Sequence, residues 1–235
     1  MKETPPDHPR TILTPMRLVI GFAMGLLVTL IYSGILFGVA GRLDLPTYWA
    51  YIAISGVLCI VGFTGIDPGL LRERIRPGQG GKDQIMIPFA KLALTAHLVV
   101  SALDVGRYHF SDTIPLALEI TGLVLFTLGL ALTVYCLVYN KFFSSVVRIQ
   151  EDRGHTLVST GPYAIVRHPG YTGMITFMIG SCLALGSWWG GLPAIMFIAL
   201  ILRRLRIEDR FLKTELEGYE AYMQRVRSRL VPCIW

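Results

Sequence analysis

The sequence predicts an all-α, polytopic membrane helical bundle with four spans, a C-terminal helical hairpin, and a cytoplasmic or interfacial helix. Three observations predict this fold class. Hydrophobic residues make up 53% of the chain and charged residues only 16%, whereas about one quarter of a soluble domain is charged. Several uncharged runs are long enough to cross a hydrocarbon core, which needs roughly 20 apolar residues of helix. Lys and Arg are also distributed between these runs as membrane topology requires.

The predicted spans follow one another through the first 140 residues. Uncharged runs cover residues 18–40, 45–66 and 120–140, and each is predicted to cross the membrane. The first run is too long for the apolar core of a secretion signal, so we expect a retained span. Residues 84–103 form a fourth predicted span, because Lys91 lies near its start and can extend its charge to the interface.

A longer apolar run, residues 169–202, has 34 residues without a charged side chain. As one helix it would be about 51 Å long at ~1.5 Å per residue, too long for a single crossing. Helix-breaking residues lie at its middle and predict two short helices in a tight hairpin. They are Gly186, Gly190, Gly191 and Pro193. The charged segment from Arg203 is expected to continue the second helix out of the membrane, with a break at Gly218 before an interfacial helix.

The distribution of positive charge predicts the topology. If the chain crosses at every predicted span and twice at the hairpin, 20 of its 22 Lys and Arg residues lie on one side. The positive-inside rule makes that side cytoplasmic. We therefore expect a multi-pass integral membrane protein with both termini cytoplasmic, in a bacterial inner membrane. The net charge of +6 reflects this topology, so a nucleic-acid partner is not expected and the lipid bilayer is.

Two regions are predicted. Residues 1–139 carry the N-terminal transmembrane helices and a basic loop, 67–83, expected to be a solvated cytoplasmic connector. Residues 140–235 carry the hairpin, 169–202, the C-terminal helices and the candidate site. The sequence has no Rossmann, HExxH or GxSxG motif, and its five histidines lack metal-ligand spacing, so no metal site is predicted.

A first cluster of functional candidates lies just before and within the start of the hairpin. It consists of His155, Tyr163, Arg167, His168 and Tyr171. Pro169 suits the first turn of a helix, and the N–H groups and positive dipole end of that helix favour a carboxylate. The alternative is an interfacial belt in which tyrosine and arginine anchor at the lipid headgroups.

A second cluster follows the hairpin and consists of Arg203, Arg204, Arg206, Glu208 and Asp209. Arg204 and Glu208 are four residues apart and face one side of a helix. The alternative is a simple surface ion pair between them. Both clusters are expected at one membrane depth, around an apolar hairpin. This arrangement favours a site where a polar cofactor meets a lipophilic substrate.

Three segments carry a family resemblance: "HTLVSTGPYAIVRHPGYTG", "RRLRIEDRFL" and "GYEAYMQRVRSRLVP". Together they resemble the C-terminal half of the isoprenylcysteine carboxyl methyltransferase family, a group with phospholipid N-methyltransferases and bacterial relatives. The resemblance covers roughly residues 140–235 and is to a bacterial-type member. It implies a membrane-embedded methyltransferase that uses S-adenosylmethionine on a lipophilic small-molecule or prenylated acceptor. Glu208 and Asp209 stand where many members have paired glutamates.

The resemblance also implies roles for particular residues. The implied cofactor contacts are His155, Thr156, Leu157, Val158, Tyr163, His168, Pro169, Gly170, Tyr171 and Glu208. A further contact falls on either Arg148 or Gln150. Arg204 matches the family's substrate-side arginine and is the predicted catalytic residue.

Other functions stay open at the level of sequence. The acceptor could be a carboxylate, a phospholipid amine or a thiol. An NADPH-dependent enzyme similar to sterol reductases is a second enzymatic reading, and a membrane scaffold or transporter is the non-enzymatic one. A transporter is expected to show charges within its spans and paired broken helices, whereas this sequence has only one broken hairpin.

Overall fold

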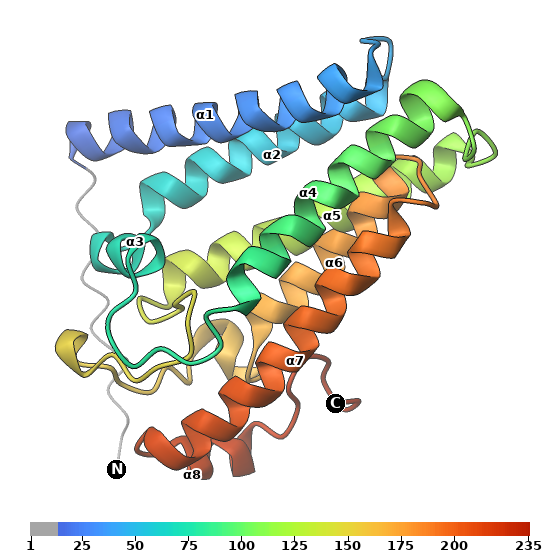
Figure 1. Ribbon diagram of the computed structural model, residues 1–235. Coiled ribbons are helices and arrows are strands. Elements are labelled where there is room, and N and C mark those ends of the chain that lie inside the picture. Colours follow the sequence, from blue (N-terminus) through green and yellow to red (C-terminus); the bar gives the residue numbers. More distant parts are fainter. Residues whose placement is uncertain (1–13) are drawn as a thin grey trace.

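The computed structural model describes residues 14–235, and its regular elements in that range are helices (Figure 1). The α-helices are α1 (Pro15–Ala40), α2 (Pro46–Gly65), α3 (Pro68–Ile75), α4 (Met86–Leu103), α5 (Leu116–Tyr139), α6 (Pro169–Ala184), α7 (Gly191–Glu215) and α8 (Tyr219–Arg225). A π-helical turn, Asp104–Tyr108, extends α4, and two 3-10 turns, Glu151–Arg153 and Gly161–Ala164, lie between α5 and α6. The N-terminus, predicted to be cytoplasmic, lies outside the described residues.

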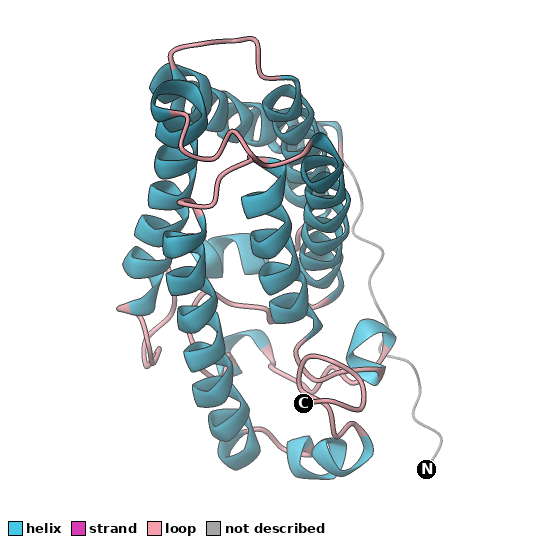
Figure 2. Ribbon diagram, turned by 90° about the vertical axis from the view of Figure 1, so that its right-hand side faces the viewer, coloured by secondary structure: helices cyan, strands magenta, loops and turns pink. Residues whose placement is uncertain are grey.

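The predicted membrane bundle is confirmed. Four helices are long and apolar enough to cross a membrane: α1, α2, α4 with its π-helical turn, and α5. The apolar run at 169–202 is broken as predicted, into α6 and the first half of α7. Gly218 separates α7 from α8 in a left-handed conformation, with φ 79°, which glycine adopts without steric cost. Figure 2 shows the helices running along the bundle and the loops gathered towards its ends.

Proline sets the start of several helices. Pro15, Pro46, Pro68 and Pro169 each occupy the first turn of a helix, where the missing N–H leaves no intrahelical bond unmade. The segment before α6 is thereby forced out of helical geometry. This fixes the position at which the chain enters the bundle from the loop that carries the first cluster.

The closest helix contact is between α5 and α6, which meet backbone to backbone. A Cβ atom on Gly129 would lie 2.2 Å from the Phe177 nitrogen, and one on Gly180 would lie 2.3 Å from the Phe126 nitrogen. Small residues allow such approach where packing must drive association within lipid. Gly38 on α1, by contrast, has nothing within 4 Å of that position.

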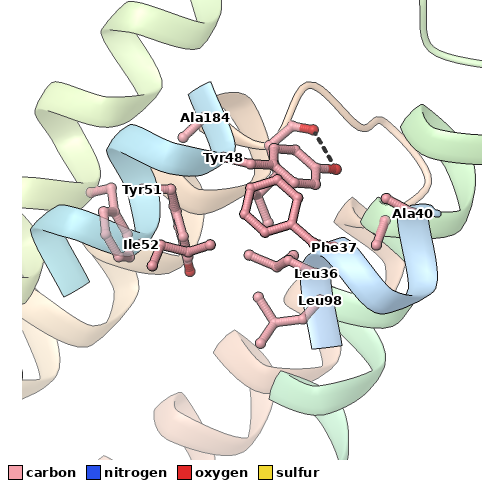
Figure 3. Close-up of a cluster of buried hydrophobic side chains, with 11 residues drawn as sticks. Leu36, Phe37, Ala40, Tyr48, Tyr51, Ile52, Leu98 and Ala184 are labelled. Carbon is pink, nitrogen blue, oxygen red and sulfur yellow. Dashed lines mark hydrogen bonds between the residues drawn. The ribbon is translucent and has the colours of Figure 1, made fainter. Parts of the chain in front are cut away.

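The buried side chains form two clusters. The first joins α1, α2, α4, α5 and α6 (Figure 3) and comprises Leu36, Phe37, Ala40, Tyr48, Tyr51, Ile52, Leu98, Ala102, Phe126, Ala184 and Leu185. The buried Tyr48 hydroxyl donates a hydrogen bond there to the Leu185 carbonyl at 3.4 Å. The second cluster includes Met178, Phe197 and Leu205, and supports the functional end of α6 and α7.

The two ends of the bundle differ in charge. At one end, the Asp104 carboxylate accepts hydrogen bonds from Ser111 at 2.6 Å and Ser187 at 2.5 Å, which tie the turn after α4 to the hairpin loop. The opposite end gathers α3, the loop between α5 and α6, and α8 (Figure 1). Residues 67–85, 140–168 and 203–235, which contain those segments, hold 16 of the 22 Lys and Arg residues.

Residues 67–83 are only in part a solvated connector. Residues 68–75 form α3, capped by Asp67, whose carboxylate accepts from the Leu70 N–H at 2.8 Å. Leu70 is fully buried, and Glu73 is only 5% exposed. The helix folds back because Glu73 pairs with Arg148 in the loop after α5, a partner 75 residues away.

Candidate active site

The loop between α5 and α6 begins the site, and Arg148 fixes its position. The Arg148 guanidinium donates to both Glu73 oxygens, at 2.8 Å and 2.7 Å, and to Asp152 at 2.8 Å. A bidentate contact between a guanidinium and a carboxylate fixes the relative orientation of the two side chains. Lys82 and Val147 add an isolated antiparallel bridge. The loop and α3 are therefore held as one unit.

Asp209 is the centre of a buried hydrogen-bond network that positions the start of α6. Its carboxylate accepts from Arg167 at 2.9 Å and 3.0 Å, from His168 at 3.0 Å, from Tyr219 at 2.9 Å and from Arg229 at 2.9 Å. Burial raises the pKa of Asp209, but the bonds from His168, Arg167 and Arg229 outweigh it and hold the pKa well below its ordinary value. Arg167, a member of the first cluster, thus packs α6 against α7 and the C-terminal segment.

A polar cavity of about 70 Å³ lies between this loop, α6 and α7. Nine of the ten predicted cofactor residues line it: His155, Thr156, Leu157, Val158, Tyr163, His168, Gly170, Tyr171 and Glu208. The tenth, Pro169, is absent from the wall and starts α6. Arg148 lines the cavity as well. Gln150 is buried behind it and donates from its amide to the Phe142 carbonyl at 2.8 Å.

His155 is neutral in its surroundings. Burial lowers its pKa to about 4, and the charges of Arg153 and Arg148 act in the same direction, against the opposing effect of Glu208. Its Nδ1 accepts from the Gln150 N–H at 3.3 Å, which a neutral ring can do. The ring also stacks on Phe142, with centroids 4.5 Å apart. His155 therefore presents a flat, uncharged surface to the cavity.

A second cavity adjoins the first and is largely apolar. Its walls come from α4, α6, α7 and the start of the loop, and include Met86, Ala90, Leu94, Met174, Phe197 and Ile201. Phe143, Ser144 and Tyr171 line both cavities. The two spaces thus share a wall at the charged end of the hairpin.

Tyr171 connects the residues of the second cluster across that wall. Its hydroxyl accepts from Arg204 Nε at 2.8 Å and donates to Glu208 at 2.5 Å. Arg204 and Glu208 are 3.9 Å apart, so the tyrosine mediates most of their contact. Glu208 faces the polar cavity and Arg204 the apolar one. The ion pair considered as an alternative is present at this distance, but it does not lie at the surface, because Arg204 is only 3% exposed.

Sequence reasoning missed part of the walls. The polar cavity is also lined by Asn140, Phe142, Phe143, Ser144, Val146, Val147, Leu212, Leu216, Tyr219 and Tyr222, beside Arg167 of the first cluster. Tyr219 and Tyr222 belong to the segment "GYEAY", whose aromatic spacing could have indicated them. The residues of 142–147 lack such a pattern.

Three comparisons bear on the class of protein. Residues 118–217 match the family described as phospholipid methyltransferase. A probable protein-S-isoprenylcysteine O-methyltransferase of Oryza sativa subsp. indica is 28% identical over 145 residues, which cover 59% of this chain and 71% of the relative. The protein-S-isoprenylcysteine O-methyltransferase of Schizosaccharomyces pombe is 31% identical over 95 residues, or 38% of this chain and 39% of that protein.

The fold also has a solved counterpart. The structure of a eukaryotic intramembrane Ras methyltransferase, isoprenylcysteine carboxyl methyltransferase, matches 92% of this chain and 74% of that one, with a TM-score of 0.57 and 22% identity. Taken with the relatives, the shared fold and the cavities at the hairpin define a multi-pass, membrane-embedded methyltransferase. Residues 118–217 match the wider phospholipid methyltransferase group, and the chain is similar in sequence and fold to isoprenylcysteine carboxyl methyltransferases.

Proposed function

We propose that the polar cavity binds S-adenosylmethionine and that the apolar cavity receives a lipophilic methyl acceptor. The observation that carries this proposal is the wall shared by the two cavities, formed by Phe143, Ser144 and Tyr171. A polar cofactor and a lipophilic acceptor entering from different sides would meet there. In this proposal residues 140–235 are the cofactor-binding region, and residues 1–139 hold the membrane helices and complete the acceptor cavity.

The residues of the polar cavity fit the proposed cofactor. Gly170 lines the cavity at the N-terminal end of α6, and the dipole of that end favours a carboxylate. Glu208 suits an ammonium group. The rings of Tyr163 and Tyr171 line the same space and can stabilise a sulfonium cation.

S-adenosylmethionine supplies an electrophilic methyl group whose departure leaves a neutral sulfide. The protein's own task is to align two reactants and exclude water. Burial raises the pKa of Tyr163, which stays protonated, and the low pKa of His155 makes it a weak base. An acceptor that is already ionised, such as a carboxylate, needs no base. Its oxygen forms the new bond to carbon, the bonding pair leaves with sulfur, and no proton moves.

The relatives suggest which acceptor this is. Those compared above are named for isoprenylcysteine, a lipid-modified amino acid that ends in a carboxylate. We propose a prenylated or similarly lipophilic carboxylate as acceptor, with Arg204 as its cationic partner, since a guanidinium pairs well with a carboxylate. A phospholipid amine and a thiol are the alternatives, and both would need deprotonation.

The orientation proposed in the membrane follows the charge. The end of the bundle that holds α3, α8 and the loop after α5 carries most Lys and Arg residues. The positive-inside rule supports placing it in the cytoplasm with both termini, and a bacterial inner membrane as the location. The cofactor would then enter from the cytoplasm.

The decisive experiment supplies labelled S-adenosylmethionine and membrane extract to the purified protein, identifies the methylated product, and measures cofactor binding by calorimetry. Glu208→Gln should weaken cofactor binding about tenfold, the value of a hydrogen bond to a charged group. Arg204→Lys should leave cofactor binding intact and impair acceptor turnover, because lysine lacks the planar fork. Glu217→Gln and Arg210→Lys, both exposed on this side of the protein, are the matched controls.

Three results would count against this assignment. A folded sample without affinity for S-adenosylmethionine or its demethylated product at millimolar concentration excludes the cofactor. Saturable binding of NADPH in its place favours the reductase reading. Equal loss of cofactor binding in Glu208→Gln and Arg204→Lys would remove Arg204 from the acceptor side.

A further inference from the structure

The apolar cavity has an unusual charge composition. Its lining residues include three cations, Arg74, Lys91 and Arg204, and no carboxylate. The remaining lining residues are apolar or neutral. Ionised groups in such surroundings are costly unless they are paired. The cavity is therefore complementary to an amphiphile with an anionic head.

Arg204 has unused hydrogen-bonding capacity inside this cavity. Its Nε donates to Tyr171 at 2.8 Å and its Nη2 to the Ser144 carbonyl at 3.4 Å. Its Nη1 is buried without a hydrogen-bond partner among the described residues. A buried donor without a hydrogen-bond acceptor lowers the stability by about 1–3 kcal/mol. The arginine is 3% exposed, so a ligand in the cavity is the natural partner for this donor.

Arg74 reaches the same space from α3. Its Nη1 donates to the Phe143 carbonyl at 2.8 Å, and its guanidinium lies 5.8 Å from the centroid of the Phe143 ring. A carbonyl and a ring leave its positive charge unneutralised. Burial and the nearby charge of Arg204 both lower the pKa of Arg74. The two guanidiniums thus repel each other, and an anion between them would relieve that repulsion.

Contacts of its neighbours along the chain hold Arg74 in this place. Its neighbour Glu73 is paired with Arg148 at the wall of the polar cavity, and the Ser145 hydroxyl donates to the Arg74 carbonyl at 3.4 Å. Arg74 and Arg204 bind the carbonyls of two successive residues, Phe143 and Ser144. They therefore flank the main chain that separates the two cavities.

We propose that Arg74 and Arg204 together form an anion receptor for the head of the acceptor, and that Arg74 determines specificity for an anionic head. This inference rests on the proposed function, because it assigns the apolar cavity to the acceptor. Two guanidiniums exclude an ammonium head by repulsion and disfavour a neutral head, which leaves them unpaired. Methylation of a carboxylate removes its charge, so the product ester binds more weakly than the substrate and is released.

The test measures binding in the absence of cofactor, with two probes that share one tail. They are an N-acylated isoprenylcysteine with a free carboxylate and its carboxamide. The wild-type protein in nanodiscs should bind the carboxylate at least about tenfold more tightly, as expected for charge-assisted hydrogen bonds. Arg74→Gln should bring that ratio close to one while its affinity for the carboxamide is retained. Arg72→Gln, exposed on the same helix, should keep the wild-type ratio.

Defined results overturn the inference. A wild-type ratio near one, or an unchanged ratio in Arg74→Gln, removes Arg74 from the receptor. If Arg74→Gln does not fold, Arg74→Met replaces it, and an undiminished ratio there has the same meaning because methionine lacks the positive charge. Displacement of the carboxylate probe by phosphatidylglycerol with equal affinity would assign the cavity to lipid headgroups instead. Lack of S-adenosylmethionine binding would refute the proposed function alone, since these measurements omit the cofactor.

Discussion

Asp209→Asn is the substitution with the largest expected effect on stability. Four side chains donate five hydrogen bonds to this carboxylate, which is 2% exposed. Asparagine is nearly the same size, but it replaces one acceptor oxygen with a donor and removes the negative charge. Arg167, 6% exposed, then keeps a buried charge without its counter-ion.

Breaking a buried ion pair in this way costs about 3–5 kcal/mol. For a chain of this length each kcal/mol shifts the melting temperature by roughly 2–4 °C, so Asp209→Asn should lower it by about 6–20 °C. The assay is a thermal melt of the detergent-purified protein. Glu217→Gln is the matched control on a nearby carboxylate, and its melt should stay near the wild type because that side chain is exposed. A melt of Asp209→Asn within 2 °C of wild type would show that the network does not hold the end of α6.

Three further predictions concern binding, pH and packing. Tyr171→Phe removes the hydroxyl between Glu208 and Arg204; turnover should fall about 10- to 100-fold, by analogy with other lost charge-assisted bonds, and wild-type steady-state rates would contradict the bridge. His155, whose folded pKa of about 4 lies below its unfolded value, stabilises the fold above about pH 6.5 and loses that contribution as the pH falls towards 4. The melting temperature should therefore drop between pH 6.5 and 5, and it should drop less in His155→Gln. Equal slopes of melting temperature against pH in the two proteins would exclude this histidine. Gly129→Ala should destabilise the protein by about 1–3 kcal/mol through overpacking, whereas Gly38→Ala, in open space, should not; equal melts would contradict the close α5–α6 contact.

Much of the fold could be predicted from the sequence because its information is local. A helix that crosses lipid must be apolar along its whole length, so span positions follow from the absence of charge. The hairpin followed from glycine and proline in one apolar run. Nine wall residues of the polar cavity were predicted because they stand in two short motifs, around His155 to Tyr171 and at Glu208.

The remainder depends on contacts between distant parts of the chain. In the segment 67–83, frequent charge and glycine indicate a solvated loop. Glu73 is buried only because Arg148 neutralises it, and neither residue indicates the other in sequence. Arg74 and Arg204 are 130 positions apart in the sequence and line one cavity, and here too neither residue indicates the other in sequence. Asp209 was noted as a member of a charged cluster, but the convergence of its donors follows from the packing of α6, α7 and α8.

The shared wall at Phe143, Ser144 and Tyr171 has a kinetic consequence. On the proposed function, each reactant dissolves in a different phase, and the reaction takes place at the boundary. The relevant concentration of the acceptor is then its mole fraction in the bilayer, whereas that of the cofactor is its molarity in water. Adding inert lipid at fixed total acceptor should slow turnover, and diluting the whole vesicle suspension at saturating cofactor should leave turnover per enzyme unchanged. The turnover rate of the enzyme therefore depends on the lipid composition of its membrane.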